Sequence, residues 1–154
     1  MMMGFAVLLH VIAVVIWVGG MFFAYMVLRP VAAAKLEPPA RLTLWAGVFS
    51  GFFPWVWVCI AGVLGSGLWM MFKVFGGFAA PVYIHAMFGL GIVMMLIFMH
   101  VFSAPYQRLK KAVAAEDWPE GGRQLAQVRR LVGINTIIGV ITIVTATAGR
   151  YLAG

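Results

Sequence analysis

Hydrophobic and polar positions fall into long blocks along this chain. Four apolar runs cover residues 5–28, 43–72, 80–104 and 131–152, and short polar stretches separate them. Each run reaches the ~20 residues that an α-helix needs to cross the hydrocarbon core of a bilayer. The pattern therefore predicts an all-α fold, an integral membrane four-helix bundle that forms a single transmembrane domain over residues 1–154.

The ends of the apolar runs predict where helices stop. The first run has no charged segment before it and stays apolar as far as Arg29, so we expect a retained helix rather than a removed signal peptide. Pro30 is expected to end that helix, which makes VAAAKLEPPARLT a short connector along the membrane interface. The segment AAEDWPEGGRQ is expected to be a polar loop, with Pro119, Gly121 and Gly122 as helix breakers.

Composition and charge support the same class of protein. With 64% hydrophobic and 10% charged residues, the chain has too little polar surface to cover a soluble globule. The net charge of +7 comes from short segments that flank the apolar runs, which is typical of membrane topology and not of nucleic-acid binding. The positive-inside rule then predicts an N-out/C-out, multi-pass protein of the bacterial inner membrane, with the lipid bilayer as its first partner.

Two histidines fall at matching depth within the apolar runs. His10 lies about six residues into the first run and His85 about five into the third, so each imidazole is expected roughly 8 Å below the outer end of its helix. The first and third helices should run in the same direction, and facing imidazoles are suitable axial ligands for haem iron. The two positions predict a bis-histidine haem b site near the periplasmic face.

The third histidine is expected at the other end of the third helix. His100 follows His85 by fifteen residues, which places it ~22 Å further along the helix and beyond reach of the same iron. It could ligate a second haem together with Met21 or Met26, or bind a proton, a quinone or a substrate. Satisfying an interfacial hydrogen bond is the simpler role for this side chain.

Four further residues are candidates for contact with the haem. Lys73 and Arg150 are the two basic residues expected on the outer side, where they could bind the haem propionates or act as ordinary anchors at helix ends. Trp17 follows His10 by one heptad, so it shares the face of His10 and could pack on the porphyrin or fill the core. Tyr83 could donate a hydrogen bond near the haem edge.

Methionine offers a different interpretation. The chain has 11 methionines, and soft thioethers are ligands that select Cu(I). Copper is therefore the alternative cargo or cofactor, although scattered methionines also serve as adaptable core filler. The single cysteine, Cys59, can form neither a disulfide nor a cysteine cluster within one chain, and its apolar surroundings favour packing.

Three segments carry a family resemblance. LLHVIAVVIWVGGMFFAYMVLRP, PVYIHAMFGLGIVMMLIFMH and RRLVGINTIIGVITIVTATAGRYL resemble CopD-type copper resistance membrane proteins and the related HemJ-type protoporphyrinogen oxidases. The resemblance implies a four-helix membrane protein that binds haem b through His10 and His85, and that handles copper or moves electrons. HemJ-type proteins carry a lysine two residues after the third-helix histidine, where this chain has Met87.

The sequence thus predicts a membrane haem b protein for electron transfer at the outer face. Its partners would be a quinone or a periplasmic redox or copper protein, a homo-oligomer is compatible with the pattern, and oxidoreductase activity is left open. The alternative is a copper permease or copper resistance transporter that uses methionine and histidine ligands. A second alternative is a structural subunit of a larger membrane complex.

Overall fold

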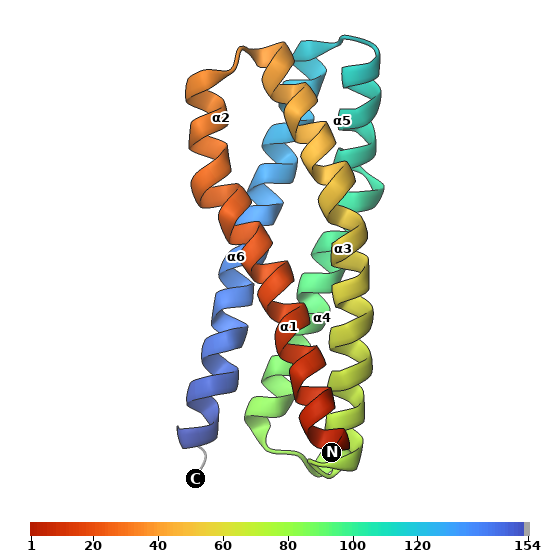
Figure 1. Cartoon of the computed structure of the whole chain (residues 1–154), viewed down its shortest axis with the longest axis vertical. Helices are drawn as coiled ribbons and strands as arrows, with labels where there is room; N and C mark the ends of the chain where they lie inside the picture. The colour runs from red at the N-terminus through yellow and green to blue at the C-terminus, as the bar shows by residue number, and fades with distance from the viewer. Residues whose placement is uncertain (153–154) are drawn as a thin grey trace.

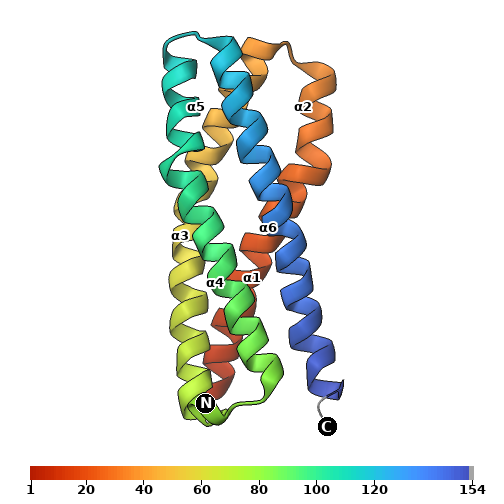
Figure 2. The same ribbon diagram turned by 180° about the vertical axis from the view of Figure 1, so that it is seen from behind.

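The computed structural model describes residues 1–152, except for the side chains of Arg150 and Leu152. This part of the chain is almost entirely helical (Figures 1 and 2). Short turns join the helices. The elements are α1 (Met2–Phe23), a π-helical turn (Ala24–Leu28), α2 (Arg29–Lys35), α3 (Pro38–Lys73), a 3₁₀ turn (Gly77–Ala79), α4 (Val82–Ser103), α5 (Pro105–Ala114) and α6 (Trp118–Leu152).

These elements form four membrane-spanning segments, each called a column below. The segments that are long and apolar enough to cross a bilayer are Met2–Lys35, Pro38–Lys73, Val82–Ala114 and Trp118–Gly149. In Figure 1, α1 and α4 both run away from the end of the bundle where the chain starts, and α3 and α6 return to it. The predicted all-α membrane bundle and the parallel course of its first and third columns are confirmed.

The first column does not end at Arg29-Pro30, and the connector prediction is wrong. The helix continues through Pro30 to Lys35, and only Leu36 and Glu37 separate it from α3. A proline ring clashes with the carbonyl four residues earlier in a regular helix. The π-helical turn that precedes Arg29 widens the backbone at this point, which accommodates the proline without a break.

The predicted loop at residues 114–124 is mostly helical. α6 begins at Trp118, with Pro119 in its first turn, where a proline is tolerated because the amide hydrogen would have no partner. The Asp117 carboxylate caps the helix by accepting a hydrogen bond from the Glu120 amide at 3.1 Å. Gly121 is a packing residue, since a Cβ there would lie 3.1 Å from Leu42 Cδ1 of α3.

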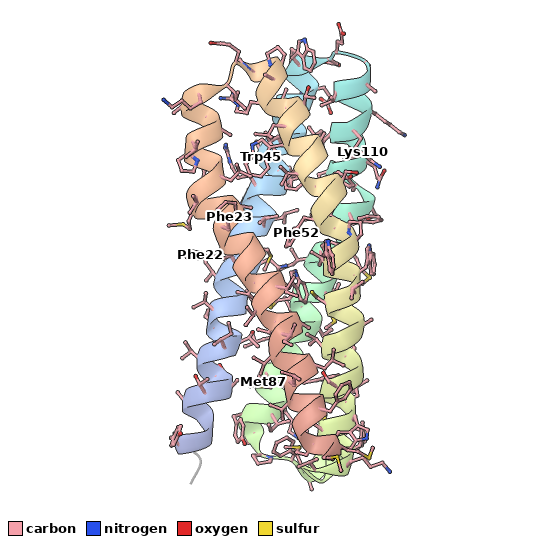
Figure 3. All side chains as sticks on the ribbon, viewed as in Figure 1. Phe22, Phe23, Trp45, Phe52, Met87 and Lys110 are labelled. Carbon is pink, nitrogen blue, oxygen red and sulfur yellow. The ribbon has the colours of Figure 1, made fainter. Side chains whose placement is uncertain are left out.

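An aromatic cluster fills the centre of the bundle. Phe53 of α3 stacks on Phe49 with ring centroids 5.1 Å apart and meets Phe98 of α4 edge to face at 5.3 Å. Phe22 and Phe23 point away from α1 on the outer surface, as Figure 3 shows, and both are exposed. The bundle therefore buries an aromatic core and presents apolar side chains to the lipid.

Candidate functional site

A cavity beside His10 lies between α1, α3, α4 and α6, in the half of the bundle where the chain starts. Its volume is about 90 Å³. The side chains that matter for its chemistry are His10, Trp17, Met71, Met87, Met94 and Met95. Met87 is labelled in the lower half of Figure 3, on α4. We call this space the His10 cavity.

Hydrogen bonds fix the orientation of the imidazole. The Ser66 hydroxyl donates to the Gly62 carbonyl oxygen at 2.5 Å, one turn earlier in α3. The Ser66 oxygen also lies 2.9 Å from His10 Nδ1, and the tautomer of the imidazole sets the direction of this hydrogen bond. In the tautomer that carries its proton on Nδ1, the lone pair of Nε2 is available to a ligand.

Gly67 makes room for this ring. A Cβ at position 67 would lie 3.2 Å from His10 Cε1 and 3.6 Å from Nδ1. The imidazole therefore packs directly on the α3 backbone, one residue after the serine that holds it. Two consecutive residues of α3, Ser66 and Gly67, determine where the histidine of α1 sits.

The donors around the cavity are soft. Met71, Met94 and Met95 are buried, and Met87 is half-buried. Among the described residues, no group of three or more His, Cys, Asp or Glu side chains could hold a metal ion. Cys59 is buried in the core and does not line the cavity. Besides the Thr142 hydroxyl, which donates to the Ile138 carbonyl oxygen, the remaining donors are imidazole and thioether, and this set suits Cu(I) better than zinc or a hard cation.

The other predicted site residues on α4 are not brought to this cavity. His85 is half-buried and does not line it. Tyr83 packs against α6 instead, because a Cβ at Gly149 would lie 2.8 Å from Tyr83 Cβ. His100 is exposed, and its carbonyl oxygen accepts a hydrogen bond from the Ser103 hydroxyl at 3.3 Å.

The remaining candidates divide between the core and the helix ends. Trp17 is buried, lines the His10 cavity and meets Phe98 edge to face with ring centroids 6.4 Å apart. Lys73 is exposed and is the last residue of α3. The Arg150 side chain lies outside the part of the chain that the structure describes.

The His10 cavity gives no support for a haem. Its volume of about 90 Å³ is below the ~300–1,000 Å³ of pockets for small molecules, and His85 does not line it. The axial pair of His10 and His85 stays a prediction from the sequence.

Two polar residues inside the bundle escaped the sequence analysis. Ser66 holds His10, and Asn135 is buried with its Nδ2 3.3 Å from the Met94 carbonyl oxygen and 3.7 Å from Met21 Sδ. Each interrupts an apolar run, and Asn135 is the single asparagine of the chain. Because polar residues at membrane depth are functional candidates, a search for polar positions within the apolar runs would have identified both Ser66 and Asn135.

A family model for copper resistance protein D matches residues 46–148, which is more than half of the chain. The chain belongs to the CopD family. No curated protein and no solved structure matches it. Ser66, Gly67 and the four cavity methionines lie inside the matched region, and His10 lies before it. As a CopD-family protein with four apolar helices, the chain is a multi-pass membrane protein, consistent with the bacterial inner membrane.

Proposed function

We propose that this CopD-family protein handles copper in the membrane by binding Cu(I) in the His10 cavity. The observation that carries the proposal is the His10 imidazole, which lines a cavity together with four methionines while its Nδ1 lies beside the Ser66 hydroxyl. The family description, copper resistance, agrees with such a cargo. The copper alternative from the sequence analysis is therefore favoured over haem-based electron transfer.

The chemistry of the cavity suits a monovalent soft cation. Every donor is neutral, so the site would gain one positive charge and not two when the ion enters. Thioether and imidazole donors form strong bonds to Cu(I) and weak ones to Mg²⁺ or Ca²⁺, which require oxygen ligands. The surrounding apolar side chains, such as Val14 and Ile92, shield the ion from water.

We further propose the orientation given by the positive-inside rule, with both ends of the single domain on the periplasmic side. The His10 cavity would then lie in the outer half of the bilayer. Copper would reach it from the periplasm, where a copper-binding protein could deliver the ion.

The test is a Cu(I) titration of the detergent-purified protein against a chromophoric Cu(I) chelator. We expect one Cu(I) per chain, and we expect His10→Ala to lower the affinity at least tenfold, because it removes the one nitrogen donor of the cavity. His100→Ala is the matched control, since this exposed histidine does not line the cavity. Equal affinities in both variants would overturn the proposed site.

Haem b binding, with a quinone or a periplasmic redox partner, and the HemJ relationship stay predictions from the resemblance alone. The same preparation tests them through its visible spectrum and a pyridine haemochromogen assay. A low-spin spectrum lost in both His10→Ala and His85→Ala would support the haem interpretation against the copper one.

A further inference from the structure

A second and larger cavity lies at the opposite end of the bundle, where α2 joins α3 and where α6 begins. Its volume is about 230 Å³. Figure 3 labels Trp45, one of its lining residues, in the upper half of the bundle. Its charged and aromatic lining consists of Tyr25, Arg29, Arg41, Trp45, Phe49, Trp118 and Arg129. We call this space the arginine cavity.

The three arginines give the cavity an unbalanced positive charge. Arg29 comes from α2, Arg41 from α3 and Arg129 from α6, so three separate helices each contribute one. No aspartate or glutamate lines the cavity. Glu37, the nearest acidic residue in sequence to Arg41, is exposed, and the ion pair that the described residues form joins Arg123 to Glu120.

Burial of two arginines makes the missing counter-charge significant. Arg29 and Arg41 are half-buried, and Arg29 packs over the Tyr25 ring with its guanidinium carbon 4.9 Å from the ring centroid. The ring holds this guanidinium in place and leaves its outer N–H groups unused. Like charges brought together in a partly apolar space repel each other unless an anion joins them.

The backbone contributes little to this preference, because α3 begins with Pro38 and Pro39, which have no amide hydrogen to donate. The arginine side chains therefore carry it. The guanidinium fork of arginine matches phosphate oxygens in pairs, which ammonium groups do not.

We propose that the arginine cavity binds the phosphate group of an anionic ligand, clamped by Arg29, Arg41 and Arg129. The inference is independent of copper binding in the His10 cavity. An anionic phospholipid headgroup is the expected source, because the cavity lies at the end of the spanning helices where the basic residues gather. Tyr25, Trp45 and Trp118 would pack against the glycerol and upper acyl region.

The test measures the thermal unfolding midpoint of the purified full chain in detergent with added phosphatidylglycerol, phosphatidylcholine or inorganic phosphate. We expect phosphatidylglycerol to raise the midpoint more than phosphatidylcholine does. Arg129→Gln should weaken the apparent affinity for phosphatidylglycerol by about tenfold, the effect of losing one charge-assisted hydrogen bond. Stabilisation by inorganic phosphate alone would identify a soluble phosphate as the source instead, and would still support the site.

Arg130→Gln is the matched control. Arg130 is the next residue of α6 and is exposed, as Arg129 is, but it does not line the arginine cavity, so the variant loses the same charge elsewhere. We expect it to retain the wild-type response. If Arg129→Gln does not fold, Arg129→Lys keeps the charge but not the fork and should weaken binding. Equal responses of Arg129 and Arg130 variants, or no preference for any phosphate ligand over phosphatidylcholine, would overturn the proposal.

Discussion

Removing the Ser66 hydroxyl should weaken Cu(I) binding although Ser66 itself ligates nothing. The hydroxyl oxygen lies 2.9 Å from His10 Nδ1, and in the proposed site it accepts the Nδ1 proton so that Nε2 can bind the ion. In Ser66→Ala, the imidazole loses this partner inside an apolar cavity and can rotate or exchange its proton between the two nitrogens. Both changes reduce the fraction of protein in which Nε2 is ready to bind.

The size of the effect follows from that single contact. Loss of a hydrogen bond that orients a metal-binding histidine typically costs 10–100-fold in metal affinity, or about 1.4–2.8 kcal/mol. An unsatisfied buried donor costs about 1–3 kcal/mol, which is the same range. We therefore expect the Cu(I) dissociation constant of Ser66→Ala to rise by roughly 10–100-fold, measured by competition with a chromophoric chelator.

Two controls separate the hydrogen bond from general damage to α3. Ser50→Ala changes an exposed serine of the same helix and should bind Cu(I) as the wild type does. Ser66→Thr keeps an acceptor oxygen and should recover most of the affinity. The reasoning is refuted if Ser66→Ala binds Cu(I) with unchanged affinity, or if Ser50→Ala weakens it equally.

Three further predictions follow from packing and topology. Gly20→Ala should destabilise the bundle by about 1–3 kcal/mol, because a phenylalanine ring of α3 occupies the space of the new Cβ. Gly19→Ala, where the space is open, should not destabilise it, and thermal unfolding compares the two variants. Gly67→Ala should displace the imidazole beside it and weaken Cu(I) binding by about tenfold, whereas Gly65→Ala should bind normally, as the same chelator titration would show. A tag fused after Gly154 should be accessible from the periplasm to an impermeant reagent; exclusive labelling from the cytoplasm would contradict the proposed orientation.

Hydrophobic patterning was sufficient to predict the class of fold. The apolar runs identify four spanning helices because each is long enough for an α-helix, which satisfies all of its backbone groups within lipid. Patterning was not sufficient to predict where the helices end, because proline and glycine either break a helix or are accommodated within it. Pro30 follows a π-helical turn and Pro119 lies in a first turn, so neither breaks a helix, and Gly121 permits close packing against α3.

The candidate site was predictable only in part. Depth along a helix was enough to select His10, which lines a cavity in the structure, because depth depends on one helix alone. Which methionines surround His10 depends on the rotation and tilt of four helices against each other, and single-sequence spacing does not determine these. The same holds for the arginine cavity, whose three guanidinium groups are far apart in sequence and come together through packing of α2, α3 and α6.

The two cavities bear on whether copper can cross this bundle. A small cavity of about 20 Å³ lies between them, lined by Trp17, which also faces the His10 cavity, and by Phe49, which also faces the arginine cavity. Buried Met21 and Asn135 line it too, and the Asn135 amide oxygen has no hydrogen-bond partner, so the space suits one water molecule. A cation moving along this axis would next enter the arginine cavity.

That cavity opposes a cation unless its charge is neutralised. Three guanidinium groups line it and no carboxylate does, so a cation that enters meets a net positive charge. A phosphate group bound there would offset part of this charge, whereas with the arginine cavity unoccupied we would expect copper to enter and leave the His10 cavity from the same side. Occupancy of the arginine cavity would then decide between a permease and a protein that only holds copper. Cu(I) flux into liposomes with and without phosphatidylglycerol distinguishes them.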